Sequence, residues 1–193
     1  MGITHKEYFE NIYELIFTPF EFFKRDDIVI SVRQAAATIA WVSLFTIIGK
    51  AIADKSIYNN FFFWSNLLFF VGFIILAWLI TGLFFEYIAK IFGREAGLHK
   101  ILFYTSFAAV PYIFFAPLDI LKESGEVGYA IGVLSQMFLY FWIITLYAFA
   151  LKKTYNISIA RAFMMIILPF IGTIFSIGWA IGFYLKLGYI NSI

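Results

Sequence analysis

The sequence predicts an all-α, polytopic integral membrane protein with five transmembrane helices and an amphipathic N-terminal helix. Of its 193 residues, 63% are hydrophobic and 13% are charged, and the mean hydropathy is +0.88. Ordinary soluble domains carry about 25% charged residues, so this composition excludes a water-soluble fold. Between residues 34 and 187 the charges fall in short clusters that separate five apolar stretches.

The apolar stretches are long enough to cross a bilayer. A helix needs about 20 residues to span a hydrocarbon core of about 30 Å, and Arg or Lys at its ends can reach the interface. We expect a cytoplasmic amphipathic segment at 1–33, a membrane domain at 34–187 and a short tail at 188–193. The predicted spans are 34–53, 61–85, 101–121, 127–151 and 162–187.

The N-terminal segment carries an amphipathic helical pattern. From residue 7 to residue 17 apolar side chains recur near helical spacing, while Glu10, Asn11 and Glu14 occupy the other face. This pattern predicts a short helix that lies either on the membrane or on the bundle of spans.

A second short helix is predicted to begin at Thr18. Thr18 is a candidate N-cap in a capping box with Glu21, and Pro19 suits the first helical turn. In one reading the phenylalanines at positions 20, 22 and 23 enter the membrane interface beside headgroup-binding basic residues. In the other reading this helix packs against the floor of the bundle.

Prolines make two of the predicted spans irregular. The third span contains Pro111 and Pro117, and the fifth contains Pro169. Each proline removes a backbone donor and displaces a carbonyl, so we expect a kink or local unwinding there.

The positive charges predict an orientation. Ten of the 14 Lys and Arg residues lie in 1–33 and in the second and fourth connections, and four lie on the opposite side. Cytoplasmic loops are enriched in these residues, so we expect the N-terminus in the cytoplasm and the C-terminus outside. The candidate cytoplasmic interaction face comprises Lys24, Arg25, Arg94, Lys152, Lys153 and Arg161.

Two Gly-x-x-x-Gly motifs predict close helix packing. Gly128 and Gly132 open the fourth span, and Gly178 and Gly182 lie in the fifth. Small residues four positions apart let helix backbones approach. We favour packing within the chain over a dimer interface.

Asp119 and Glu86 are the candidate functional carboxylates. Asp119 follows a proline-broken stretch and could bind a cation or a proton, but an exit from the membrane into water is the favoured interpretation. Glu86 closes the second span, where an ion pair with Lys90 is favoured.

The remaining residue types point away from catalysis. The chain has no Cys, and its two His residues lie outside the predicted spans, so we predict no metal site and no cofactor. No Gly-x-Ser-x-Gly elbow, phosphate loop or pair of buried carboxylates is present. The formal net charge of +2 does not favour nucleic-acid binding.

Three stretches carry a family resemblance. The first, at 16–23, contains Thr18 and Pro19; the second, at 92–102, leads from a glycine-containing loop to Pro111; the third is Trp142 followed by 155–162. In this order on five spans they resemble the Yip family, the Ypt-interacting membrane proteins. The first stretch is similar to the Pro-x-x-x-Phe helix start of prokaryotic members.

The resemblance implies a non-enzymatic membrane protein with a cytoplasmic N-terminus that often self-associates. Eukaryotic members bind Rab-type GTPases and act in vesicle traffic, but this chain has only about 33 residues before its first span. We therefore expect a prokaryotic plasma-membrane member, and GTPase binding is not favoured. The expected partners are membrane lipids and membrane proteins, including a second copy.

Three functions are compatible with these patterns. The leading hypothesis is a scaffold or adaptor that organises membrane proteins or lipids through its helical faces and basic side. The alternative is a small transporter or channel built on the proline-broken third and fifth spans. An intramembrane or lipid-modifying enzyme is the least favoured, because the polar groups for acid-base chemistry are absent or peripheral.

Overall fold

The computed structural model describes residues 5–53 and 61–168, and their regular secondary structure is entirely helical. Four helical stretches in this part of the chain are long and apolar enough to cross a membrane, which supports the predicted all-α polytopic fold. The elements are α1 (His5–Phe17), α2 (Pro19–Lys24), α3 (Val32–Ala53), α4 (Phe61–Ile91), α5 (Leu98–Ala108), η2 (Val110–Phe114), α6 (Phe115–Lys122) and α7 (Glu126–Tyr155). A shorter apolar helix follows at Ile159–Leu168.

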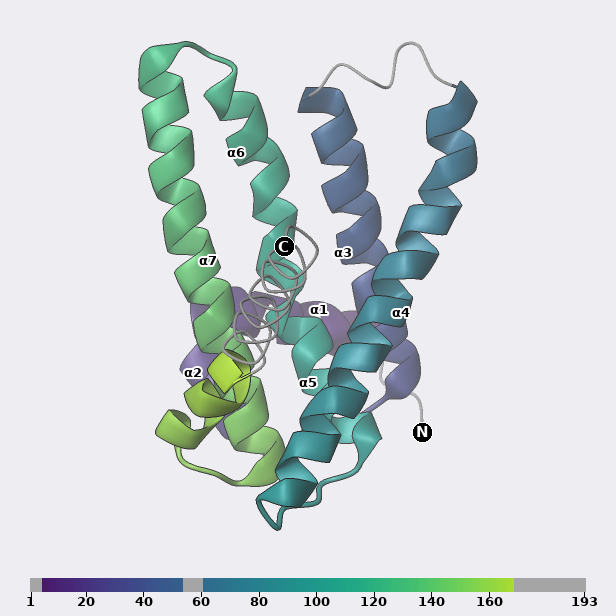
Figure 1. Ribbon diagram of the computed structural model, residues 1–193, viewed down its shortest axis with the longest axis vertical. Helices are drawn as coiled ribbons and strands as arrows, with labels where there is room; N and C mark the ends of the chain where they lie inside the picture. The colour runs from purple at the N-terminus through teal and green to yellow at the C-terminus, as the bar shows by residue number, and fades with distance from the viewer. Residues whose placement is uncertain (1–4, 54–60, 169–193) are drawn as a thin grey trace, which may run out of the picture.

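The third spanning stretch, α5–η2–α6, is the centre of the bundle. It packs against α3 on one side and α7 on the other, and α4 covers α3 and α5 (Figure 1). Every residue from 101 to 111 is buried. The polar side chains of this buried stretch have hydrogen-bond partners. The Thr105 hydroxyl accepts the indole N–H of Trp78, from α4, at 3.1 Å, and the Ser106 hydroxyl donates to the Phe103 carbonyl at 2.7 Å.

The central stretch is broken at Pro111. The α-helix ends at Ala108, a 3-10 helix with Pro111 in its first turn follows, and the α-helix resumes at Phe115. The proline ring cannot donate to the preceding turn, which favours the change in winding. The Thr46 hydroxyl of α3 lies 3.5 Å from the Tyr112 carbonyl and so partly satisfies the exposed backbone. Pro117 lies within α6, in its first turn.

The helices α4 and α7 are the least buried of the four spanning stretches in the described residues, and α4 has the higher hydropathy. Its outward side chains include Leu68, which is 77% exposed, and Phe69, which is 69% exposed. An all-round apolar helix of this kind is stable only when lipid covers its outer face. The helix continues past residue 85 to Ile91, because a charged residue at a helix end can reach the interface without ending the helix.

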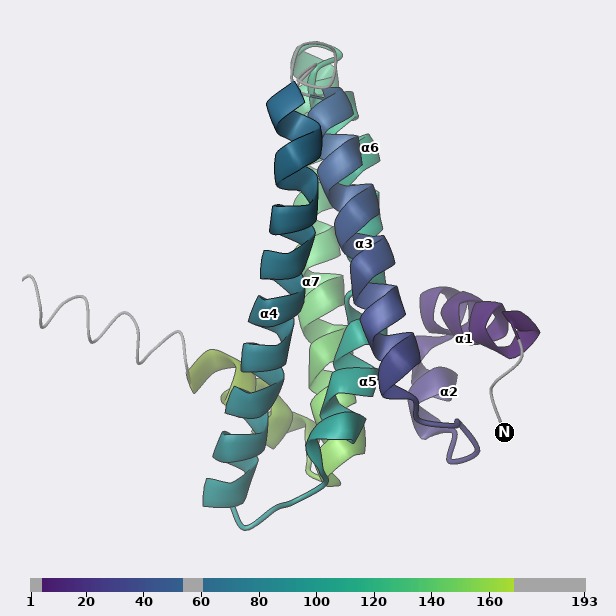
Figure 2. The same ribbon diagram turned by 90° about the vertical axis from the view of Figure 1, so that its right-hand side faces the viewer.

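The N-terminal helices fold onto the bundle. Figure 2 shows α1 lying across the upright helices on the side away from α4. Tyr8 reaches the Thr38 hydroxyl at 2.8 Å, and Leu15 is fully buried. Asn11, expected on the polar outer face, is only 5% exposed, which corrects that prediction.

Of the two readings of α2, the one in which this helix packs against the bundle is confirmed, and the one in which its phenylalanines enter the membrane interface is wrong for Phe22 and Phe23. Phe22 and Phe23 belong to the protein core, with exposed fractions of 0% and 6%, whereas Phe20 is 56% exposed. Thr18 does occupy the N-cap position, but its hydroxyl donates to the Glu14 carbonyl and the capping box does not form. The side chain bonds back to the preceding turn because α1 ends directly before it.

The fifth predicted span, 162–187, lies mostly outside the described residues. The helix Ile159–Leu168 covers its beginning, and Pro169, Gly178 and Gly182 fall in the part that is not described. The tail at 188–193 lies there too.

Candidate functional site

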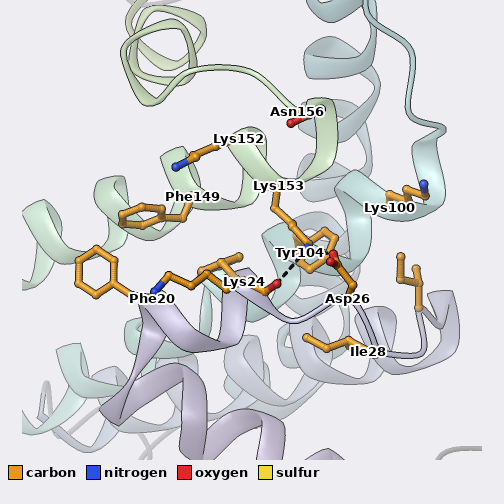
Figure 3. A pocket seen from close by; sticks show the side chains of 12 residues that line it. Phe20, Lys24, Asp26, Ile28, Lys100, Tyr104, Phe149, Lys152, Lys153 and Asn156 are labelled. Atoms are coloured by element: carbon orange, nitrogen blue, oxygen red, sulfur yellow. Dashed lines mark hydrogen bonds and ion pairs between the residues drawn. The ribbon is translucent and has the colours of Figure 1, made fainter.

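A basic pocket lies where the N-terminal helices meet the end of α7. Its volume is about 540 Å³, and the charged residues along its wall are four lysines and one aspartate. Figure 3 shows these side chains with aromatic rings beside them. The charged lining residues are Lys24, Lys100, Lys152, Lys153 and Asp26.

Aromatic packing holds Lys24 at this pocket. Lys24 ends α2, and the preceding Phe22 and Phe23 fix that helix in the core. Phe22 packs on Phe107 of α5 with ring centroids 5.4 Å apart. Phe20 meets Phe149 of α7 edge to face at 4.9 Å, a favoured aromatic arrangement. The sequence thus attaches one side of the pocket to α5 and α7.

The end of α7 supplies Lys152 and Lys153. Both lie in the last helical turn, where the helix dipole favours cations. Asn156 follows with φ of 51° and ψ of 50°, the left-handed conformation that terminates many helices and that Asn tolerates. Asn156 also lines the pocket.

The lysines of the pocket differ in their partners. Lys153 Nζ lies 2.5 Å from Asp26 Oδ1 and donates to the Lys24 carbonyl at 3.4 Å. Lys24 Nζ pairs with Glu21 at 2.9 Å on the exposed side of α2. Lys100 and Lys152 make no ion pair or hydrogen bond with the rest of the described chain. The pocket therefore presents uncompensated positive charge.

Arg25, predicted to share the basic face, is engaged elsewhere. Its guanidinium donates to Glu14 Oε2 at 2.6 Å and to Asp27 at 3.0 and 3.1 Å. The hydrogen bonds with Asp27 and then with Glu14 raise the pKa of Arg25, and the same bond to Arg25 lowers the pKa of Asp27. Arg25 therefore links α1, through Glu14, to the segment after α2, through Asp27, and its role is structural.

Arg94 and Arg161 line a second pocket, of about 360 Å³, between the end of α4 and the helix Ile159–Leu168. Its other walls include Tyr155 and two methionines. The six residues of the predicted cytoplasmic face are thus divided: three line the basic pocket, two line this one, and Arg25 belongs to neither.

Glu86 does not form the predicted pair with Lys90. The Tyr155 hydroxyl of α7 donates to Glu86 Oε2 at 2.9 Å, and Lys90 lies 3.9 Å from Glu95. Sequence spacing alone favours the neighbour four residues away, but tertiary packing brings a residue from α7 closer. Glu86 thus ties α4 to α7 beside a core cluster that includes Phe85 and Tyr155.

Asp119 lies in a polar pocket near the opposite end of the bundle. Its Oδ1 accepts from Gln136 Nε2 at 2.7 Å and lies 2.6 Å from Lys122 Nζ. Lys122 also donates to Gln136 at 3.0 Å. The pocket has a volume of about 520 Å³, and Lys50 and Glu123 complete its charged lining. Asp119 is therefore part of a polar network with Lys122 and Gln136, and its interpretation as the exit from the membrane into water stays a prediction.

The first glycine motif packs inside the chain. Gly128 and Gly132 are buried, and an added Cβ at either would meet atoms of α6 or of the turn after it. An equivalent close approach occurs at Gly49, where an added Cβ would overlap that of Ala116. This contact lets α3 and α6 meet closely.

In the described part of the chain, no three His, Asp or Glu residues lie close enough together to hold a metal ion. The basic pocket offers ammonium donors and aromatic walls, which is binding chemistry. The arrangement suits an anion or an anionic surface.

The chain was compared with known protein families, curated proteins and solved structures. A family model, the Yip1 domain, matches residues 13–180. The chain belongs to the Yip1 domain family. No curated protein and no solved structure gives a significant match. The family resemblance predicted from the sequence is thereby confirmed, as is the membrane character of this Yip1 domain.

Sequence reasoning missed several lining residues of the Yip1 domain pocket: Asp26, Lys100, Tyr104, Phe149 and Asn156. In the sequence, Lys100 counts only toward the orientation, although its place at the start of α5 sets it at the same end of the bundle as Lys24. The charge of Lys100 was a usable signal. The ring of Phe149 was not, since nothing in its local sequence distinguishes it from a lipid-facing phenylalanine.

Proposed function

We propose that this Yip1 domain is a non-enzymatic scaffold or adaptor that organises membrane proteins or lipids. The observation that carries the proposal is the basic pocket, in which lysines from α2, α5 and α7 converge on one end of the bundle. The Yip1 domain match supports a membrane-associated role of this general kind. Residues distant in sequence thus meet in one pocket, which supports a recognition surface.

The proposal includes an orientation and a location. The basic end faces the cytoplasm, following the enrichment of Lys and Arg in cytoplasmic loops, and the C-terminus lies outside. The membrane is the plasma membrane of a prokaryote, since the helix start at Pro19 is similar to that of prokaryotic members. Membrane lipids, membrane proteins and a second copy are the expected partners, and a GTPase is not.

The fold supports such a role because α1 and α2 are held against the bundle while α4 and α7 each leave one face exposed. The helices α1 and α2 are fixed on the bundle by Phe22 and by the Lys153–Asp26 pair. Outward faces of α4 and α7 are apolar, with exposed fractions of 69% at Phe69 and 75% at Phe138. A neighbour in the membrane can contact these faces while its polar part meets the basic end.

Purification from native membranes tests the proposal. The protein would be extracted in mild detergent, and its complexes weighed by native mass spectrometry after crosslinking. We expect assemblies with a second copy or with membrane proteins, weakened in K152E/K153E and retained in R33E/K90E, which reverses two charges outside the pocket. A strictly isolated monomer, without protein or lipid attached, would contradict the proposal.

A transporter or channel is the second candidate. The observation that favours it is the polar pocket of about 520 Å³ beside the broken helix, with Asp119 on its wall. Broken helices at membrane depth commonly line ion or solute sites. Reconstituted vesicles would be screened for ion and solute flux. Flux that D119N abolishes would favour this candidate, and absence of flux in the wild type would exclude it.

A further inference from the structure

The left-hand end of the basic pocket in Figure 3 combines charge with apolar surface. The amino groups of Lys24 and Lys152 point toward this end, where the rings of Phe20 and Phe149 also lie, whereas Lys100 lies at the other end. Phe20 is 56% exposed. An amphiphilic ligand would therefore find cationic groups and a ring surface together.

The charges in the pocket are strongly unbalanced. Its lining contains four lysines against the single carboxylate of Asp26. Asp26 is 94% exposed and contacts Lys153, which is 20% exposed. Lys152 has no hydrogen-bonding partner among residues 5–53 and 61–168. An anion at the Lys24–Lys152 end would neutralise the charge of Lys152, which the described protein leaves uncompensated, and would share Lys24 with Glu21.

The apolar surface continues from the pocket along α7. Trp142 lies two helical turns before Phe149 and so on the same face of the helix. Trp142 is 40% exposed, and Phe138, one turn further, is 75% exposed. An acyl chain that begins at the Phe20–Phe149 pair would therefore remain on apolar side chains as it runs toward the membrane centre.

From this combination we propose that the pocket binds one anionic phospholipid, with its phosphate between Lys24 and Lys152 and an acyl chain along Phe149 and Trp142. The inference rests on the proposed function, because it names the lipid that the basic end would organise. Lys153 stays with Asp26 and shapes the pocket floor. Lys152, in the last turn of α7, attracts an anion near it, and juxtamembrane lysines bind anionic lipids in general.

Native mass spectrometry of the full chain in nanodiscs tests the site. The nanodiscs would contain equal amounts of phosphatidylglycerol and phosphatidylcholine. We expect the wild type to retain one phosphatidylglycerol selectively and K24Q/K152Q to retain it about 25-fold less, since each of the two lysines near a membrane surface contributes about fivefold. The control R33Q/K90Q removes two charges from the same end of the bundle outside the pocket, and should retain the lipid.

Other outcomes would overturn the site. Equal retention of the two lipids by the wild type, or equal losses in the pocket and control variants, would show only general attraction to a charged surface. Displacement of the lipid by millimolar inorganic phosphate would assign the site to a free anion. F149A provides a second check, because it leaves all lysines in place but should still weaken lipid retention.

The two proposals can fail separately. Selective lipid retention by a protein that forms no assemblies would support the lipid site and contradict the scaffold. Assemblies that persist while the wild type shows no lipid selectivity would overturn the lipid site and leave the scaffold in place.

Discussion

Replacing Phe22 by alanine should release the N-terminal helices from the bundle. Phe22 is fully buried, and its ring lies between those of Phe23, at 5.1 Å, and Phe107, at 5.4 Å. A Phe→Ala change at such a site costs about 3–5 kcal/mol. The ring of Phe22 joins α2 to α5, so the cost should appear as easier detachment of α1 and α2 and not as loss of the spans.

Hydrogen exchange followed by mass spectrometry measures that detachment. About 3 kcal/mol corresponds to an exchange about a hundredfold faster, and it should be confined to peptides from α1 and α2. F17A is the matched control, because Phe17 is 65% exposed and its ring meets Tyr13 of the same helix. Unchanged protection of α1 and α2 in F22A, or an equal change in F17A, would refute this account of how the segment is held.

Three further predictions concern other contacts. G49V should lower the free energy of unfolding by about 1–3 kcal/mol, because the added atoms overlap α6; a thermal scan in detergent that shows no loss would contradict it. Y155F removes the bond to Glu86 and should cost about 1.5–3 kcal/mol in the same scan, and an unchanged midpoint would be evidence against that bond. The pKa of Asp27 is lowered, so the stability from its pairing with Arg25 is present above the usual carboxyl pKa and is lost as pH falls through the lowered value. Carboxyl chemical shifts should record an upward shift of this pKa in R25Q, and no shift would contradict the pairing.

The fold was more predictable from the sequence than the site. Long apolar runs indicate α3, α4 and α7 because lipid demands a continuous apolar surface and internal backbone hydrogen bonds. A proline in such a run also indicates the break at Pro111, since the missing donor acts locally. The central position of α5 was not predictable, because all spans are similarly apolar and lipid and protein are equally acceptable surroundings for their side chains.

Long-range partners account for the other differences. The pairing of Glu86 with Tyr155 joins residues 69 positions apart, and the basic pocket joins Lys24 to Lys152 across most of the chain. Helical spacing identifies only neighbours three or four residues away. The sequence left the burial of Phe22 as one of two readings for the same reason, since an aromatic residue in a short amphipathic helix suits a membrane interface and a protein core equally well.

Solid-state NMR of ¹⁵N-lysine protein in bilayers of phosphatidylglycerol and phosphatidylcholine tests most directly whether the basic pocket holds a lipid phosphate. Dipolar dephasing by ³¹P reports which Nζ atoms lie beside phosphorus, and single Lys→Arg variants assign the signals. The account predicts strong dephasing for Lys24 and Lys152, weaker dephasing for Lys90, and loss of the contrast in pure phosphatidylcholine. Equal dephasing of all three lysines, or none at Lys24 and Lys152, would contradict it.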